Sequence, residues 1–92
     1  HNMTEHLNIF VFGQVQGVFF RRTIKHEASR RGLKGFVQNK ADGSVYLEVE
    51  GINEEISSFM AWLEAGADGH TVKRVDTEAG AYKAFDSFEI KE

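Results

Sequence analysis

The fold of this 92-residue chain can be worked out from its central stretch, Gly35-Phe36-Val37-Gln38-Asn39-Lys40-Ala41-Asp42-Gly43-Ser44-Val45-Tyr46-Leu47-Glu48-Val49-Glu50. The Asp42-Gly43 pair favours a tight β-hairpin turn, because both residue types tolerate positive φ angles. The residues after the turn alternate between apolar and polar. This alternation predicts a strand over 44–50 whose valine and leucine side chains face inward, with Tyr46, Glu48 and Glu50 facing outward. The apolar segment 34–39 predicts its partner strand.

Before the hairpin, the sequence predicts a strand, a loop and a helix. Residues 6–13 carry apolar side chains at odd and even positions, so we expect a strand buried on both faces. Residues 14–20 contain Gly17 and are expected to form a loop. We expect a helix over 21–31, with Gly32 just beyond its C-terminal end.

After the hairpin, the sequence predicts a second helix and two further strands. Asn53 is expected to cap a helix that closes near Gly66, with apolar residues at helical spacing: Ile56, Phe59, Met60 and Leu63. We expect a weak strand over 71–78 and a final strand over 85–90.

The predicted order is therefore β-α-β-β-α-β with a short extra strand near the C-terminus. This order is typical of an α+β, ferredoxin-like sandwich, an antiparallel sheet with two helices on one face. The crossover through the first helix makes the first two strands parallel, with the third between them. The loop after the first strand and Asn39, at the end of the second, are then expected at the same edge of the sheet.

Length and composition limit the class of protein. A chain of this length is expected to form one domain over 1–92, and we interpret His1-Asn2, ahead of Met3, as a remnant of cloning. The absence of Cys excludes disulfides, a thiolate nucleophile and a sulfur-ligated zinc site. The longest apolar run, Ile9–Phe12, is far shorter than the roughly 20 residues of a membrane helix. We expect a cytoplasmic protein with no membrane partner.

Positive charge is concentrated in one segment of the chain. Between Arg21 and Lys40 there are seven basic residues and one acidic residue, although the net charge of the whole chain is −3. This distribution favours a local anion site over a broad nucleic-acid surface. A glycine-containing loop that leads into a helix N-terminus also suits an anion. Arg21, at the expected helix start, can pair with phosphate or carboxylate oxygens.

Two motifs resemble signatures of the acylphosphatase family. Gly13-Gln14-Val15-Gln16-Gly17-Val18-Phe19-Phe20-Arg21 is similar to the first signature, Gly-x-Val-Gln-Gly-Val-x-Phe-Arg. The second signature is matched by Gly35-Phe36-Val37-Gln38-Asn39, followed by Asp42-Gly43-Ser44-Val45. Phe88-Glu89-Ile90 is similar to the usual end of such chains. The family's fold is the ferredoxin-like sandwich that the pattern of elements predicts.

The resemblance implies a hydrolase that cleaves acyl phosphates to a carboxylate and phosphate, by attack of water, with no metal, cofactor or covalent intermediate. In the family, the arginine at the place of Arg21 binds the phosphoryl group, and the asparagine at the place of Asn39 positions the water. These two are the candidate catalytic residues. The candidate phosphate-binding residues are Gln16, Gly17, Val18, Phe19, Phe20 and Arg21. Many bacterial members have glycine where this chain has Phe19.

The implied partners are an acyl phosphate substrate and inorganic phosphate, as product or inhibitor, and we expect a monomer. The Gln16 side chain is expected either to touch substrate or to brace the loop, and Asp42 to form the turn. His6, His26 and His70 lack metal-ligand spacing, so no metal site is expected.

Two other functions stay open at this point. One is a domain that binds phosphate or an acyl phosphate without turnover. The other is an RNA-binding module, although its characteristic aromatic pattern is missing from the chain.

Overall fold

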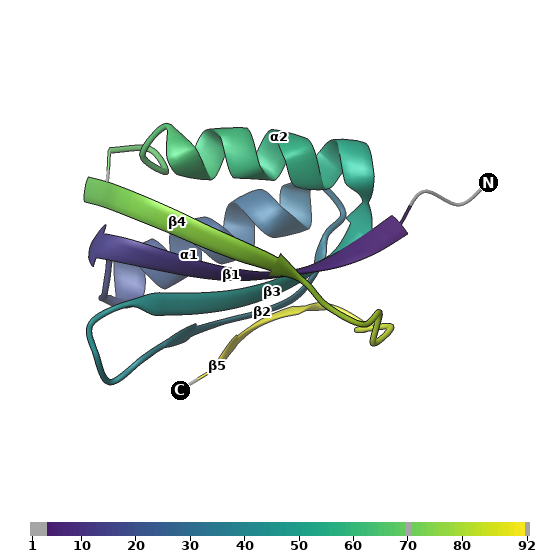
Figure 1. Cartoon of the computed structure of the whole chain (residues 1–92), viewed down its shortest axis with the longest axis horizontal. Coiled ribbons are helices and arrows are strands. Elements are labelled where there is room, and N and C mark those ends of the chain that lie inside the picture. Colours follow the sequence, from purple (N-terminus) through teal and green to yellow (C-terminus); the bar gives the residue numbers. More distant parts are fainter. Residues whose placement is uncertain (1–3, 70, 92) are drawn as a thin grey trace.

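The computed structural model describes residues 4–69 and 71–91, apart from the side chain of Val18. Five strands form one sheet, in the order β4-β1-β3-β2-β5, and both helices cover the same face (Figure 1). This confirms the ferredoxin-like α+β sandwich. The elements are β1 (Thr4–Gln14), α1 (Val18–Arg30), β2 (Lys34–Asn39), β3 (Val45–Ile52), α2 (Asn53–Glu64), β4 (Thr71–Ala79) and β5 (Phe88–Lys91).

The central strand β3 pairs antiparallel with β1 on one side and with β2 on the other. The strands β1 and β2 therefore run parallel, as expected. The sheet is mixed, however, because the extra strand β5 pairs parallel with β2. This corrects the expected all-antiparallel sheet. After β4 the chain crosses to the opposite edge of the sheet, at the end where β2 begins, so β5 must run in the direction of β2.

The hydrophobic core lies between the sheet and the two helices. Phe20, Ile24 and Ala28 of α1 are fully covered, as their spacing predicts, and α2 buries Ile56, Phe59 and Leu63. The sheet contributes Ile9, Val11, Val45, Leu47 and Val49. Each large apolar side chain buried here stabilises the fold by about 1.5–3 kcal/mol.

Both helices differ from prediction at their N-terminal ends. Helix α1 begins at Val18, with Gly17 in the N-cap position, three residues earlier than expected. The loop before α1 is shorter than the predicted 14–20, because residues 18–20 have helical backbone. Phe20, in the first turn of α1, faces the core. In α2, Ile52 occupies the N-cap position and Asn53 is the first helical residue, without a side-chain capping bond. Gly32 follows α1 with a φ of +73°, as predicted.

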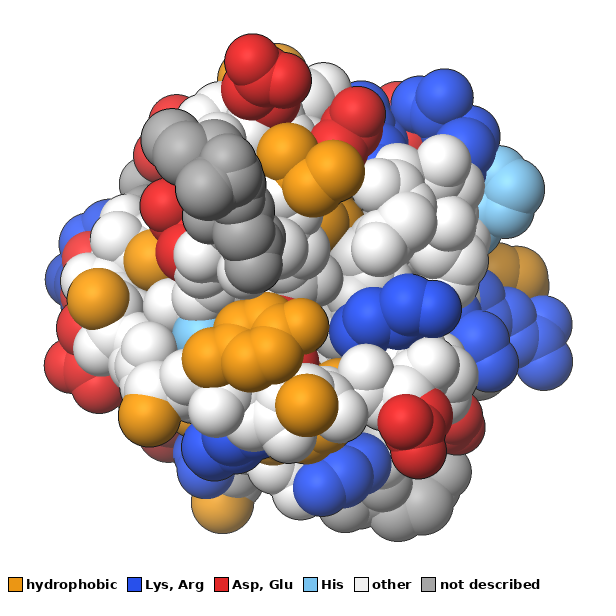
Figure 2. Space-filling model, turned by 90° about the vertical axis from the view of Figure 1, so that its right-hand side faces the viewer, with side chains coloured by type: hydrophobic (Ala, Val, Ile, Leu, Met, Phe, Trp, Pro, Cys, Tyr) orange, Lys and Arg blue, Asp and Glu red, His pale blue; other side chains and the backbone are white. Residues whose placement is uncertain are grey.

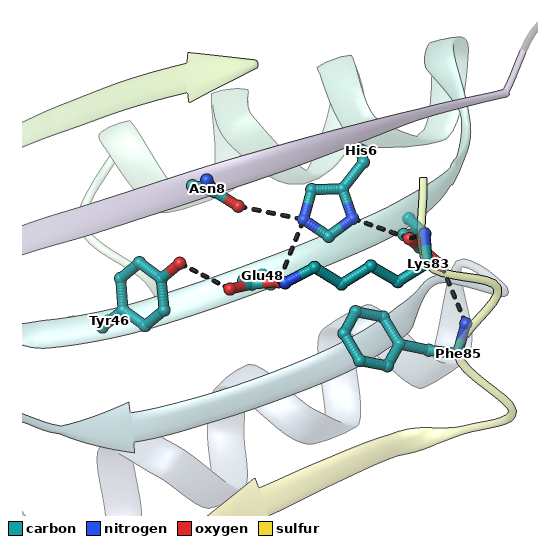
Figure 3. A network of polar contacts seen from close by, with 7 residues as sticks. His6, Asn8, Tyr46, Glu48, Lys83 and Phe85 are labelled. Carbon is teal, nitrogen blue, oxygen red and sulfur yellow. Dashed lines mark hydrogen bonds and ion pairs between the residues drawn. The ribbon is translucent and has the colours of Figure 1, made fainter. Parts of the chain in front are cut away.

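The face of the sheet opposite the helices is not simply a solvent-exposed face. Glu48 and Glu50 were expected to face water, yet they are 6% and 1% exposed, and His6 is 3% exposed. The segment 80–87, between β4 and β5, crosses this face and covers these side chains (Figures 1 and 3). By contrast, Phe10 and Phe12 of β1 are only half-buried, so β1 is fully buried on the helix side alone.

The covered side chains form a polar network around His6 (Figure 3). Its Nδ1 lies 2.6 Å from Glu50 Oε2, and its Nε2 lies 2.9 Å from Asn8 Oδ1 and 3.0 Å from Glu48 Oε1. Both ring nitrogens thus lie within hydrogen-bonding distance of side-chain oxygens. Glu48 also accepts bonds from Tyr46 Oη (2.6 Å) and Lys83 Nζ (3.0 Å).

Glu50 fastens the segment 80–87 to the sheet. Its carboxylate accepts the backbone N–H groups of Lys83 and, at 2.9 Å, Phe85. Burial raises the pKa of Glu50, but these two bonds and the contact with His6 outweigh it and hold the pKa below its usual 4.5. The ionised form is therefore the one that stabilises the native chain.

We predict that Glu50→Gln lowers the free energy of unfolding at pH 7 by about 2–3 kcal/mol, because a buried charged acceptor is lost. The native pKa of Glu50 lies below its unfolded value, so its stabilisation is complete above about pH 5 and is lost as pH falls. Urea titrations at pH 7, 5, 4 and 3 should show the wild type and the variant converging at low pH. Glu64→Gln, an exposed change at the end of α2, serves as the control. A constant difference between wild type and variant at every pH would contradict this assignment.

Candidate active site

Two glycines lie around the connection from β1 to α1, Gly13 near the end of β1 and Gly17 at the N-cap of α1, and each has a different structural reason. Gly13 has a φ of +141°, and a Cβ there would lie 2.2 Å from the carbonyl oxygen of Thr71 in β4, so the packing of the two strands excludes a side chain. Gly17 has a φ of +127°, with nothing within 4 Å of the position of a Cβ. Its backbone conformation favours glycine, and the space beside it is open to an approaching ligand.

The start of α1 is suited to hold an anion. Among the described side chains none caps it, and no acidic residue lies in its first turn. The Arg21 N–H donates to the carbonyl of Gly17 at 3.4 Å, the first bond of the helix. An α-helix leaves its earlier N–H groups without intrahelical acceptors and carries partial positive charge there. The potential at this end of α1 therefore favours an anion.

Phe19 fits its position in the first turn without strain. Its backbone belongs to α1, and it is not among the residues with positive φ. Glycine is therefore not required here by conformation. The Phe19 side chain is 73% exposed and does not pack into the hydrophobic core.

The side chain of Gln16 braces the loop. Its Nε2 donates to the carbonyl oxygens of Lys40, at 2.6 Å, and Ser44, at 2.9 Å. Of the two expected roles for this side chain, the structure thus supports the brace. These two bonds tie the β1–α1 loop directly to the turn between β2 and β3.

The turn itself is stabilised by Asp42, as predicted. Its Oδ1 accepts the backbone N–H of Ser44 at 2.9 Å and the Ser44 hydroxyl at 2.6 Å. These bonds lower the pKa of Asp42, which keeps the carboxylate ionised. An acceptor engaged in this way is a structural group and not a proton donor for catalysis.

The structure brings Arg21 and Asn39 to the same edge of the sheet. Val45 of β3 is paired with Val11 of β1 on one side and with Asn39 of β2 on the other. Neighbouring strands lie about 4.7–4.9 Å apart, so the end of β1 and the end of β2 are separated by one strand. The β1–α1 loop, which leads to Arg21, and the C-terminal end of β2, which is Asn39, therefore lie at the same end of the sheet; β1 and β2 both end at the left of Figure 1.

A hydrogen bond to β5 shows where the guanidinium of Arg21 lies. Its Nη1 donates to the carbonyl oxygen of Lys91 at 3.3 Å. Lys91 is paired with Gln38, the residue before Asn39. The half-buried Arg21 side chain therefore reaches the C-terminal end of β2, where Asn39 lies. The role of β5 was not foreseen, because no local pattern shows which carbonyl a long side chain will reach.

Asn39 presents a buried acceptor. Its Oδ1 is almost fully covered and accepts no hydrogen bond from the residues that the structure describes. A buried carbonyl oxygen without a partner costs free energy, about 1–3 kcal/mol. Asn39 Oδ1 is therefore a candidate acceptor for a hydrogen bond from a water molecule or a ligand.

Other features lie outside this site. Within 4–69 and 71–91, no group of three or more His, Cys, Asp or Glu side chains is placed to hold a metal ion. His26 is exposed on α1, and His70 lies outside the described residues. A shallow hollow beside β4, lined by Glu64 and residues 72–75, contains none of the candidate residues. Neither of the described helices is long and apolar enough to cross a membrane.

Comparison with known proteins shows similarity in both sequence and fold. An acylphosphatase of Thiobacillus denitrificans is 39% identical over 82 residues, covering 87% of this chain and 92% of that protein. The solved structures of acylphosphatases from Coxiella burnetii and Bacillus subtilis each superpose with a TM-score of 0.89. The first is 30% identical and covers 98% of this chain and 94% of its own; for the second the values are 31%, 98% and 100%. A sequence profile described as Acylphosphatase matches residues 7–90, and the chain therefore belongs to the acylphosphatase family.

Proposed function

We propose that this protein hydrolyses acyl phosphates to a carboxylate and inorganic phosphate. The observation that carries this proposal is the convergence of three groups at one edge of the sheet. These are the uncapped start of α1, the Arg21 guanidinium beside the end of β2, and the unpartnered Oδ1 of Asn39. The first two bind an anion, and the third orients a neutral nucleophile.

The phosphoryl group is held by main-chain N–H groups and by Arg21. The cradle comprises Gln16, Gly17, Val18, Phe19, Phe20 and Arg21. The N–H groups and the guanidinium are fixed before substrate arrives, so they stabilise the charge on the phosphoryl oxygens without reorganising during the reaction. The planar guanidinium matches two phosphoryl oxygens at once.

The leaving group explains why so few catalytic parts are needed. Cleavage of the bond between phosphorus and the acyl oxygen releases a carboxylate, which is stable without protonation, so no general acid is required. The transition state of phosphoryl transfer is loose and demands little of the nucleophile. We propose that Asn39 Oδ1 accepts a hydrogen bond from the attacking water, whose oxygen bonds to phosphorus. An oxygen of the phosphoryl group takes the water proton.

All of these groups come from one copy of the chain. We therefore propose a single domain over 1–92 that acts as a monomer, with inorganic phosphate as product and competitive inhibitor. We further propose that it works in the cytoplasm, without a metal, a cofactor or a nucleic-acid partner.

Hydrolysis of benzoyl phosphate in excess EDTA tests the activity directly. We expect turnover that EDTA does not reduce, and no turnover of a phosphate monoester, whose alkoxide leaving group requires an acid. Release of benzoate can be followed by absorbance. Binding of phosphate without any hydrolysis would indicate a domain that only binds the anion, and loss of activity restored by an added metal would refute the metal-free mechanism.

Arg21→Gln should raise KM sharply and nearly abolish turnover, because the side chain that holds the phosphoryl charge is lost. Arg22→Gln is the matched control, since Arg22 is the next residue of α1 and is exposed. Steady-state kinetics with benzoyl phosphate should show near wild-type values for the control. Equal losses in the two variants would indicate that only the general positive potential matters.

Asn39→Ala should lower kcat by about 10²–10³-fold, comparable to the loss of one oriented hydrogen-bonding group at a transition state. Phosphate should still bind, because Arg21 and the start of α1 are unchanged. The measurement is kcat together with the inhibition constant of inorganic phosphate. A variant with wild-type kcat would disprove the assigned role of Asn39.

A further inference from the structure

The side chain of Gln16 joins two parts of the proposed site. Its carboxamide nitrogen donates to two carbonyl oxygens, those of Lys40 at 2.6 Å and Ser44 at 2.9 Å. A carboxamide nitrogen carries two hydrogens, so these two bonds use both of them. Because both partners are acceptors, the nitrogen and not the oxygen of the amide must face them. The β1–α1 loop is thereby fastened to the turn that begins directly after Asn39.

The two carbonyl groups also take part in the backbone bonds that close this turn. The Ser44 carbonyl accepts the N–H of Lys40 at 2.9 Å, and the Lys40 carbonyl accepts the N–H of Gly43 at 3.2 Å. A carbonyl oxygen has two lone pairs, so each of them can accept a second bond from Gln16. The Gln16 nitrogen therefore bonds to both ends of the turn at once. It restrains the backbone of Lys40, the residue that follows Asn39.

The end of β2 has a sheet neighbour on one side only. Within the described residues the pairing of β2 with β5 reaches as far as Gln38, which is paired with Lys91. On the other side, Asn39 is paired with Val45, the last pair between β2 and β3. Backbone pairing thus restrains Asn39 less than it restrains the residues before it. A restraint on the next residue along the chain therefore acts directly on the position of Asn39.

The groups that are proposed to hold the phosphoryl group are anchored by other contacts. The β1–α1 loop is anchored in the core by Val15, which is 1% exposed. The guanidinium of Arg21 donates to the carbonyl oxygen of Lys91 at 3.3 Å. Neither contact involves the side chain of Gln16. Loss of the Gln16 amide should therefore displace Asn39 more than it displaces the anion-binding groups.

Resting on the proposed function, we propose that Gln16 is a positioning residue that fixes the Asn39 side chain relative to the bound phosphoryl group. Its backbone N–H belongs to the cradle, whereas its side chain acts on the attacking water through Asn39. A displacement of about 1 Å in a reacting geometry lowers a rate by as much as about 10²-fold. The Gln16 side chain therefore contributes to kcat and contributes little to the affinity for phosphate.

The first measurement compares Gln16→Met with Gln14→Met. Methionine is about as long as glutamine but has no N–H to donate. Gln16→Met should lower kcat for benzoyl phosphate about ten-fold, and the inhibition constant of inorganic phosphate should change less than about two-fold. Retained inhibition by phosphate also shows that the variant is folded. Gln14→Met is the matched control, because Gln14 is exposed and lies only two residues earlier, and both constants should stay near wild type.

A double-mutant cycle shows whether the Gln16 side chain acts through Asn39. In the Asn39→Ala background the group that orients the water is already absent. Adding Gln16→Met to that background should therefore lower kcat no further than about two-fold. A side chain that merely stabilised the loop would lower kcat by the same factor in both backgrounds.

Ile52→Ala is the control for a change far from the site. Ile52 is 53% exposed and is paired with Thr4, at the end of the sheet opposite the β1–α1 loop. Figure 2 shows this opposite end, where hydrophobic side chains are scattered among acidic and basic ones. Ile52→Ala should leave kcat unchanged in both backgrounds.

The outcomes separate the two proposals. If the wild type hydrolyses benzoyl phosphate and Gln16→Met keeps its kcat, or loses the same factor in both backgrounds, the positioning proposal is overturned and the proposed function stands. If phosphate inhibition weakens as much as kcat falls, the side chain serves to bind the anion, and the positioning proposal is again overturned. If the wild type does not hydrolyse benzoyl phosphate, the proposed function fails, and the positioning proposal fails with it.

Discussion

The site depends on one constraint, the antiparallel pairing of β3 with both β1 and β2, which makes β1 and β2 parallel to each other. A single residue, Val45, is opposite Val11 on one side and Asn39 on the other. Because β1 and β2 end at the same edge, the chain that leaves β1 must pass close to the end of β2. A shift of one residue in the pairing of β2 with β3 would turn Asn39 to the other face of the sheet. The position of the proposed water-binding group is therefore set by backbone hydrogen bonds.

Side-chain contacts then fix the parts that backbone pairing leaves free. Gln16 fastens the loop to the carbonyl oxygens of the β2–β3 turn, and Arg21 reaches the last residues of β5. Each contact joins segments that are far apart in the chain. In the proposed mechanism, preorganisation of this kind allows a guanidinium, a carboxamide and main-chain N–H groups to act without a strong base.

The polar network beneath the segment 80–87 belongs to a different part of the molecule. His6 and Glu50 lie near the beginning of β1 and the end of β3, whereas the β1–α1 loop follows the end of β1. Glu50 accepts two backbone N–H groups of the segment 80–87, and this segment leads into β5. The network thus holds the segment that leads into β5, the strand whose Lys91 carbonyl accepts the bond from Arg21.

The residue pattern alone was sufficient for the order of the elements, for the Asp42-Gly43 turn, and for the position of the β1–α1 loop and Asn39 at the same edge of the sheet. These features depend on periodicity, turn chemistry and the geometry of a crossover, which act over short distances or follow general rules. Tertiary structure decided the start of α1, the burial of Glu48 and Glu50, and the parallel pairing of β5. Alternation within a strand tells which side chains share a face, but it does not tell whether a distant segment will cover that face. Such coverage depends on where the chain returns, and only the packed molecule specifies that.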